Sequence, residues 1–410
     1  SDDKAWLATV VGQYVEATGD TAILEEQIPF LEGQVLRDGE DEAFFEPAIS
    51  QTTASLYEHC ARGLDKSLAT GVHGLPLMGT GDWNDGMNRI GEGGKGESVW
   101  LAWFLHNALS RFMRYAEERH DAARSTSWLM HTTALKEAIE EQGWDGDWYR
   151  RAYFDDGTPL GSALNRECRI DSIAQAWGVI SGAADPERAK RAMEAVDKYL
   201  VRNADGLIML FEPPFVSTDH DPGYIKGYPA GLRENGGQYT HGVLWSVQAF
   251  AMLGNGEKAQ ELFAMINPIN HARDRAAMQR YRVEPYVTTG DVYSITPHIG
   301  RGGWSWYSGS AGVMYRVGME NILGLRHVNG GLLIDPCIPS HWPGFTAKVR
   351  IGRATFDITV ENPQSRNRGV ARIEVDGVAV ASPSKPICVK RDTVSSQKVR
   401  VVLGSREHGN

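Results

Sequence analysis

The sequence lacks several features that define common classes of protein. It has no apolar run approaching the ~20 residues of a membrane-spanning helix, and its formal net charge of -10 argues against a nucleic-acid binder. Its four cysteines are far apart and show no CxxC spacing: Cys60, Cys168, Cys337 and Cys388. This spacing favours free buried thiols in a reducing compartment over disulfides or a zinc site.

Motifs of several enzyme classes are missing too. The chain has no GxSxG and no HExxH, and its glycine-rich stretch at 300–312 lacks the lysine of a nucleotide P-loop. The N-terminus, SDDKAWLATVVGQYVEATGD, shows neither the basic nor the apolar region of a signal peptide. It begins at what resembles a helix cap. We therefore expect a cytoplasmic segment without membrane contact of its own, taken from a longer protein.

Hydrophobic periodicity predicts the fold class. Helical patterns, each followed by Gly, Pro or Asp, fill most of the chain: 4–17, 51–68, 97–118, 132–142, 171–184, 187–201, 238–254, 257–265 and 309–323. Long loops rich in Gly and Trp between such helices favour an α/α toroid with a site at one end. From residue 331, alternating Val, Ile and Thr predict antiparallel strands. The expected protein is mainly α, with a helical domain over 1–330 and a small antiparallel β segment over 331–410.

The stretch MGTGDWNDGMNR, at 78–89, is the first candidate site. It places Asp82, Trp83, Asn84 and Asp85 among glycines that allow a ligand close to the backbone. A tryptophan beside a carboxylate offers a face on which a pyranose ring can stack. Its apolar surface also excludes water from the carboxylate and so raises the pKa of the acid. An Asx-turn beside a core tryptophan would give the same pattern, so spacing alone leaves both interpretations open.

Two further loops contain residues suited to an anion. GLRENGGQYTHG, at 231–242, brings Arg233, Glu234 and His241 to the start of a helix, where backbone N–H groups favour negative charge. GRGGWSWYSGSAG, at 300–312, offers the Ser308 hydroxyl and the Gly309 amide before another helix. Taken alone, an arginine and a histidine more often form a surface pair and a core histidine, and a glycine-rich stretch is more often a turn. Together, the three loops favour a carbohydrate site with an adjoining anion site.

Six blocks of the chain resemble, in order, the glycoside hydrolase family 94 phosphorylases, and especially the phosphorylase-like domain of cyclic β-1,2-glucan synthases. The blocks are LPLMGTGDWNDGMNRIGEGGKGESVWLAWFL, WDGDWYRRAYFDDGTPLGSALNRECRIDSIAQAWGVISGA, LRENGGQYTHGVLW, RVEPYV, GRGGWSWYSGSAGVMYR and LGLRHVNGGLLIDPCIPSHWPGF. The resemblance implies an (α/α)6 barrel, here without its first helices. It also implies an inverting phosphorylase with inorganic phosphate as co-substrate and neither cofactor nor metal.

The resemblance also assigns residue roles. It implies that Asp85 is the catalytic acid and that phosphate binds His241, Ser308 and Gly309. The residues it implies at the sugar are Trp83, Asp82, Asn84, Arg233, Glu234, Glu284 and Tyr286. Arg233 stands where cellobiose-specific members carry lysine. In the family, further arginines and aspartates contact the phosphate and the sugar. They belong to a region that precedes the position of SDDKAWL, where this sequence begins.

The expected reaction shortens linear β-1,2-glucan with phosphate to give α-glucose 1-phosphate. The expected partners are therefore a β-glucan oligosaccharide and phosphate. The chain would act within a larger synthase polypeptide at the cytoplasmic face of the inner membrane, or as a homodimer. One alternative is a stand-alone 1,2-β-oligoglucan or cellobiose-type disaccharide phosphorylase. Another is a non-catalytic glucan-binding remnant.

Overall fold

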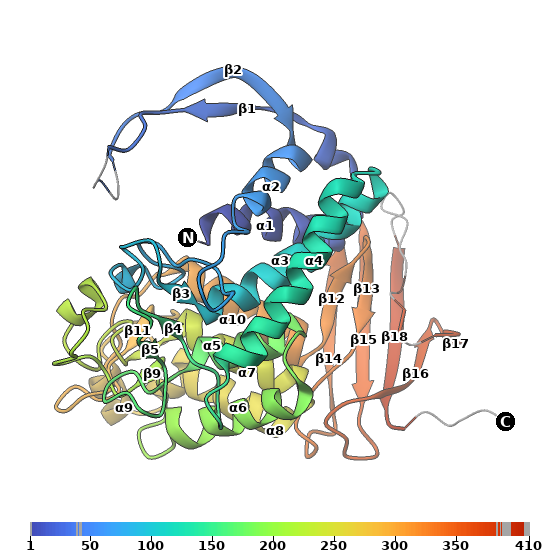
Figure 1. Ribbon diagram of the computed structural model, residues 1–410. Helices are drawn as coiled ribbons and strands as arrows, with labels where there is room; N and C mark the ends of the chain where they lie inside the picture. Colours follow the sequence, from blue (N-terminus) through green and yellow to red (C-terminus); the bar gives the residue numbers. More distant parts are fainter. Residues whose placement is uncertain are drawn as a thin grey trace.

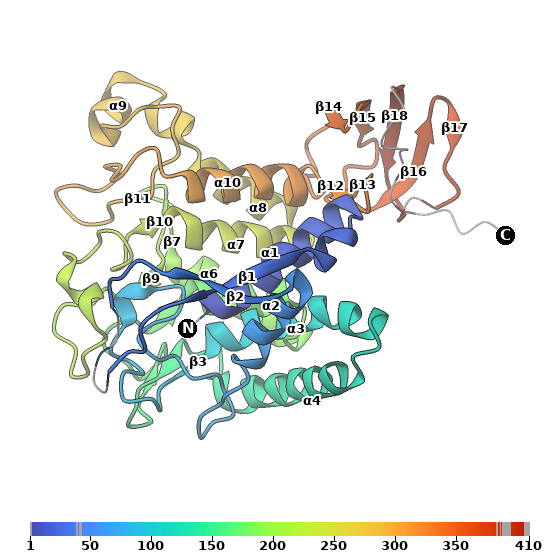
Figure 2. The same ribbon diagram turned by 90° about the horizontal axis from the view of Figure 1, so that it is seen from above.

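The computed structural model describes residues 2–37, 40, 43–382, 384–385, 387 and 395–405. Figures 1 and 2 show a helical body with long loops gathered at one end and a β-sheet at the other. Three of the predicted thiols, Cys60, Cys168 and Cys337, are free and buried, while Cys388 lies outside the described residues. Within the described part of the chain, no helix combines the length and hydrophobicity that crossing a bilayer requires.

The predicted mainly helical character is confirmed. An inner series of helices packs in chain order: α1 (Asp3–Thr18), α3 (Val99–Glu118), α5 (Ser172–Ser181), α7 (Thr240–Met252) and α10 (Ser308–Arg316). An outer helix packs against each of the first four: α2 (Leu56–Asp65), α4 (Ala122–Ala138), α6 (Pro186–Leu200) and α8 (Gly256–Ile266). Arg316 of α10 donates to the Gln13 side chain of α1 at 2.8 Å, which links the last inner helix to the first.

Several element bounds differ from the prediction. Helix α4 starts ten residues before the expected 132, and α9 (Arg275–Tyr281) was not predicted. The prediction of helix from residue 51 was wrong, because β2 (Ala48–Ser55) extends to Ser55 and α2 begins only at Leu56. The β-branched stretch before Ser55 favours a strand. The Ser55 hydroxyl then accepts from the amide of Glu58 and starts the helix.

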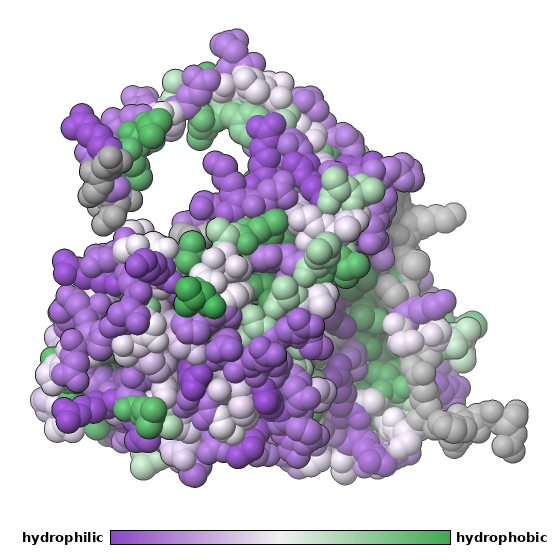
Figure 3. Space-filling view, in the orientation of Figure 1, coloured by the Kyte–Doolittle hydropathy of each residue, from purple (hydrophilic) through white to green (hydrophobic). Residues whose placement is uncertain are grey.

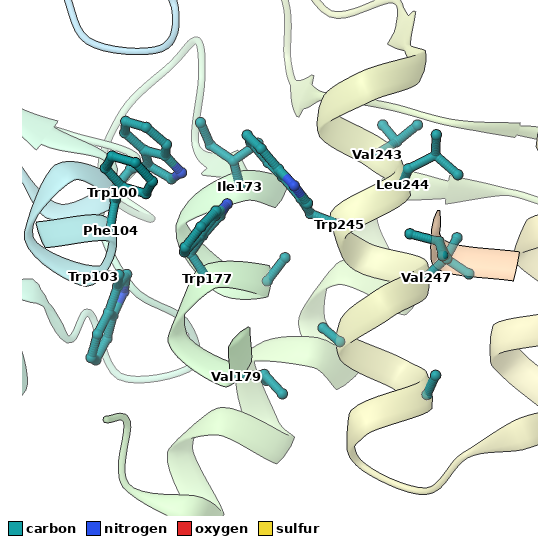
Figure 4. Close-up of a cluster of buried hydrophobic side chains, with 14 of the residues drawn as sticks. Trp100, Trp103, Phe104, Ile173, Trp177, Val179, Val243, Leu244, Trp245 and Val247 are labelled. Atoms are coloured by element: carbon teal, nitrogen blue, oxygen red, sulfur yellow. The ribbon is translucent and has the colours of Figure 1, made fainter. Parts of the chain in front are cut away.

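Bulky aromatic side chains fill the space between α3, α5 and α7 (Figure 4). Trp100 and Trp103 of α3 are fully buried, and the Trp100 ring stacks on Phe104 at 5.3 Å. Trp177 of α5 contacts Trp245 of α7 edge-on, with the ring centroids 5.3 Å apart. Since large aromatic side chains dominate core energetics, this cluster fixes how the inner helices sit relative to one another.

A two-stranded arm projects from the helical body. Strand β1 (Gln27–Glu32) pairs antiparallel with β2, and both were missed by the sequence analysis. Figure 3 shows the arm as an arch with hydrophobic residues along its underside. Leu31 and Ile49 are cross-strand partners and are both largely exposed. An isolated hairpin is marginally stable, so most of its support comes from its attachment to η1 (Ala22–Glu25) and α2.

The C-terminal strands form two sheets. A hairpin of β12 (Leu325–Val328) and β13 (Gly331–Ile334) precedes a five-stranded sheet in the order β14-β15-β18-β16-β17. Its strands are β14 (Gly344–Ile351), β15 (Ala354–Glu361), β16 (Val370–Val375), β17 (Val378–Ala379) and β18 (Ser395–Leu403). The predicted antiparallel pairing is confirmed for β14 with β15, β16 with β17 and β16 with β18, but β18 lies parallel to β15. Alternating hydrophobicity indicates that a strand is present, but it does not indicate which strand is its neighbour.

Short strands and turns shape the loops at the other end. They are β3 (Glu97–Ser98), β4 (Ala152–Tyr153), β5 (Pro159–Leu160), β6 (Ile170–Asp171), β7 (Val201–Arg202), β8 (Leu207–Ile208), β9 (Phe211–Glu212), β10 (Gln238–Tyr239) and β11 (Asp291–Val292). Strands β3, β6 and β10 run directly into α3, α5 and α7. The pairings of these strands therefore fix where the inner helices begin.

Candidate active site

The acid loop, residues 78–89, is anchored by a buried ion pair. Both oxygens of the Asp82 carboxylate accept from the Arg151 guanidinium at 2.6 Å. The Ser98 hydroxyl, at the start of α3, donates to Asp82 at 2.7 Å. Burial alone would raise the pKa of Asp82, but the charge and hydrogen bonds of Arg151 lower it, so the carboxylate is ionised. Asp82 therefore lies inside the protein as a support for the loop and not at the open site.

The same arginine approaches a second carboxylate. Its Nε lies 3.3 Å from Oδ2 of Asp171, the residue that caps α5 by accepting from the amide of Ile173. Burial raises the pKa of Asp171 to about 6, although the nearby charge of Arg151 opposes this change. Arg151 thus ties the acid loop to the start of α5.

The predicted acid lies at the exposed end of this anchored loop. Asp85 starts the short helix η2 (Asp85–Met87), and burial raises its pKa, followed by the negative charges of Asp3, Glu234 and Asp82. A raised pKa keeps a carboxyl group protonated at higher pH, as a general acid requires. Asn84 is only 2% exposed, and its side-chain amide has no hydrogen-bond partner among the described residues.

Close packing fixes η2 against the 3-10 helix η4 (Tyr224–Gly227). A Cβ added to Gly86 would lie 2.8 Å from the Cβ of Ile225, so no larger side chain fits between the two elements. The Asn88 side chain accepts from the amide of Tyr224 at 3.0 Å. The half-exposed Tyr224 lies close enough to Asp85 for that carboxylate to contribute to its raised pKa, after burial as the main cause.

Trp83 joins the acid loop to the 231–242 loop. Its ring meets His241 edge-on at 5.4 Å and lies 5.0 Å from Trp245, one turn further along α7. Gly242 makes this approach possible, because a Cβ there would lie 2.9 Å from the Trp83 ring. Burial lowers the pKa of His241 to about 4, so at neutral pH its imidazole is uncharged and offers one N–H donor.

The N-termini of α7 and α10 differ from those of most helices in the described part of the chain. Side chains of Ser, Asp or Asn cap α2, α3, α4, α5, α6, α8 and α9. In α7 and α10 the capping positions are Tyr239 and Tyr307, and neither side chain accepts from the first turn. The Tyr239 hydroxyl donates to that of Tyr307 at 3.5 Å, so the two N-termini lie together.

These two helix ends carry the residues predicted to hold phosphate. His241 is the second residue of α7, and Ser308 and Gly309 are the exposed first two residues of α10. N–H groups in the first turn of a helix are natural anion ligands, and the helix dipole adds to their effect. The structure therefore places His241 against Trp83, and it brings the start of α10, with Ser308 and Gly309, next to the start of α7.

Arg233 is held between two aromatic rings. Its guanidinium lies 3.8 Å from the centroid of Trp304 and 4.2 Å from that of Tyr228, while its Nε is 3.3 Å from the Glu234 carboxylate. Its backbone has φ +51°, and its amide donates to Asp291 at 2.8 Å. The rings and the carboxylate fix the guanidinium at the rim of the site.

Glu284 and Tyr286 lie on a segment apart from the acid loop, before the 300–312 loop. The Glu284 carboxylate accepts from the indole N–H of Trp306 at 3.1 Å, and the ring of Tyr286 projects outward. No contact recorded for the described residues joins this pair to the acid loop. Glu284 is therefore joined to the 300–312 loop through Trp306.

The sequence did not reveal Arg151 and Asp171 as supports, nor that Tyr239 and Tyr307 leave the N-termini of α7 and α10 uncapped. Arg151 lies in the block WDGDWYRRAYF, but two adjacent arginines give no sign that one is buried and the other is not. The available signal for the tyrosines was the absence of Ser, Thr, Asp or Asn immediately before α7 and α10.

The acid loop thus lies against aromatic rings of α7, whose uncapped N-terminus adjoins that of α10. Residues 1–324 match the model described as "Glycosyl hydrolase 94 superfamily, catalytic domain". The chain belongs to this family, as the six sequence blocks indicated.

Curated relatives include several kinds of glucan- and disaccharide-active protein. The chain is 50% identical over 374 residues to the cyclic beta-(1,2)-glucan synthase NdvB of Rhizobium meliloti, covering 91% of this chain and 13% of that protein. It is 32% identical to a solabiose phosphorylase of Paenibacillus borealis, covering 94% and 48%. It is 24% identical to a 1,2-beta-oligoglucan phosphorylase of Listeria innocua, covering 88% and 34%. The chain thus spans less than half the length of each of these relatives.

Proposed function

We propose that this chain is the catalytic part of an inverting glycoside phosphorylase that shortens linear β-1,2-glucan. Its inner and outer helices would form part of an (α/α)6 toroid, with the active site at the loop end. The observation that carries the proposal is the contact of Trp83 with His241, which places the acid loop beside the uncapped N-termini of α7 and α10. A sugar on Trp83 would then lie between an acid and an anion site.

In the proposed reaction, Asp85 gives its proton to the glycosidic oxygen while a phosphate oxygen attacks the anomeric carbon from the opposite face. The bond from the anomeric carbon to the glycosidic oxygen breaks, giving α-glucose 1-phosphate and a glucan one unit shorter. An inverting glycosidase needs a second carboxylate to activate water. Phosphate is already a nucleophilic anion, so one acid suffices. In the reverse direction, Asp85 would accept the proton of the attacking hydroxyl.

The charges near Asp85 suit this role. Glu234, Asp3 and Asp82 add negative potential that favours the protonated acid. The same potential opposes phosphate, so the anion needs the N–H groups of α7 and α10 and the His241 donor as compensation. The identity to a cyclic β-1,2-glucan synthase and the match to a 1,2-beta-oligoglucan phosphorylase support a β-1,2-linked substrate. The similarity to solabiose phosphorylase favours, as the second candidate, a phosphorylase of disaccharides.

The test is phosphate-dependent release of α-glucose 1-phosphate from linear β-1,2-gluco-oligosaccharides. It would use this chain and a version lengthened at the N-terminus to match the relatives, each with Asp85→Asn. The matched control is Asp357→Asn, which changes a half-exposed aspartate of the C-terminal sheet that pairs with Lys348. We expect Asp85→Asn to lower the rate by about 10²–10⁴-fold and the control to leave it unchanged.

The outcomes separate the alternatives. Activity retained by Asp85→Asn would exclude Asp85 as the acid. Release of glucose 1-phosphate from disaccharides but not from longer glucans would favour the disaccharide phosphorylase. If no version is active and glucan binding does not depend on Asp85, the non-catalytic binding remnant is the better description.

A further inference from the structure

Trp306 has an unusual backbone conformation at the edge of the candidate site. Its φ is +60°, in the left-handed region that bulky residues avoid, and its side chain is 71% exposed. It lies two residues before Ser308, where α10 begins. Such backbone conformations cluster at functional sites, and here the conformation coincides with a large exposed ring.

A specific contact holds this ring in place. The Trp306 indole N–H donates to the Glu284 carboxylate at 3.1 Å. Hydrogen bonds from backbone, from Ser305 and from Trp306 lower the pKa of Glu284, so the acceptor is ionised at neutral pH. Since hydrogen bonds to charged acceptors are the stronger ones, Glu284 fixes the orientation of the indole while leaving its faces open.

The other aromatic rings nearby are already engaged. The Trp304 ring lies against the guanidinium of Arg233, and the Tyr307 hydroxyl accepts from Tyr239. Tyr286, two residues after Glu284, is 71% exposed, as Trp306 is. Trp306 is therefore the aromatic residue of the 300–312 loop whose described contacts leave its faces available.

We infer that Trp306, oriented by Glu284, forms an outer subsite for a further glucosyl unit of the substrate chain. This inference rests on the proposed function and narrows its substrate class to oligosaccharides longer than a disaccharide. The cleaved unit would lie on Trp83, and the rest of the chain would pass outward over the rim. The apolar face of a pyranose ring can stack on an indole ring. This stacking is favourable because it removes apolar surface of both rings from water.

The test is calorimetric titration of the chain with β-1,2-linked glucose disaccharide and hexasaccharide, without phosphate, so that the readout does not need catalysis. We expect the unaltered chain to bind the hexasaccharide more tightly. Trp306→Ala should raise the Kd of the hexasaccharide about tenfold, which corresponds to about 1.4 kcal/mol, and should change that of the disaccharide less than twofold. The matched control is Tyr315→Ala, which removes an aromatic side chain of α10 that is 69% exposed.

Two further variants separate the ring from its orientation. Trp306→Phe keeps a stacking face but has no N–H for Glu284, so we expect a Kd between those of the unaltered chain and Trp306→Ala. Glu284→Ala should weaken hexasaccharide binding about threefold, and it should have no additional effect when Trp306 is already alanine. Additive effects of the two alanine variants would show that Glu284 does not act through Trp306.

The remaining outcomes distinguish the subsite from the proposed function. Equal affinity of the unaltered chain for both sugars, or an equal effect of Trp306→Ala on both, would overturn the outer subsite and leave the proposed function standing. An unaltered chain that binds neither sugar would overturn both. Circular dichroism and thermal unfolding of each variant exclude misfolding as the cause of weaker binding.

Discussion

Loss of the buried Arg151 is expected to destabilise the protein strongly. In Arg151→Met, the Asp82 carboxylate would lose both of its 2.6 Å hydrogen bonds, and Asp171 would lose its neighbouring positive charge. Removing one partner of a buried ion pair costs about 3–5 kcal/mol, because the remaining charge stays buried without compensation. A chain of 410 residues has an unfolding entropy of about 0.9 kcal/mol/K, so the melting temperature should fall by about 5 °C.

The effect should depend on pH. In the unaltered protein, the pKa of Asp82 is lower in the folded state than in the unfolded state, so Asp82 stabilises the fold at pH values above its ordinary pKa. This stabilisation is lost as the pH falls through the folded-state pKa. In Arg151→Met, burial would raise the folded pKa of Asp82, so the variant loses stability as pH rises. The difference in melting temperature should therefore be larger at pH 7 than at pH 5.

Thermal unfolding of Arg151→Met, Asp82→Asn and the double variant at both pH values tests this reasoning. The double variant should be less destabilised than Arg151→Met, because it removes the uncompensated charge. A melting temperature for Arg151→Met within about 1 °C of the unaltered protein, or simple additivity in the double variant, would refute the argument, since contacting residues in one ion pair should show coupling.

Three further predictions concern stability and are checked by thermal or denaturant unfolding. The unaltered protein should lose about 3 kcal/mol of stability as the pH rises from about 4 to 6, because the pKa of Asp171 is raised to about 6 in the folded state. Asp171→Asn should remove this decline, and an unchanged pH profile would contradict the argument. Trp100→Ala should cost about 3–5 kcal/mol through lost packing in the core of Figure 4; a cost below about 1 kcal/mol would mean that the helices close the cavity. Asp185→Ala should cost about 1 kcal/mol, because its side chain accepts from the amides of Glu187 and Arg188 and caps α6; no change would show that the cap is not needed.

Much of the helical part could be predicted from the sequence because its pattern is local. Hydrophobic periodicity located α3, α5, α6, α7 and α8 within a few residues. The arm and the parallel pairing of β18 could not be found this way. In both cases the pairing joins segments separated along the chain, and short-range alternation does not encode the partner of a strand.

For the candidate site, too, local features could be predicted from the sequence and long-range contacts could not. Residue types can be read directly along the chain: a carboxylate beside a tryptophan at Asp85 and Trp83, and donors at the starts of two helices. The sequence also indicates family membership, because ordered blocks over most of the chain resemble that family. These properties follow from residue identity and from spacing along the backbone.

How these residues act together depends on the packed chain. Asp82 and Asp85 are three positions apart and equally acidic in sequence, yet one is buried on Arg151 and the other is exposed with a raised pKa. The meeting of α7 and α10 through Tyr239 and Tyr307 joins positions 68 residues apart. Burial and the charges of distant residues set the ionisation of a carboxylate, and both are properties of the packed chain.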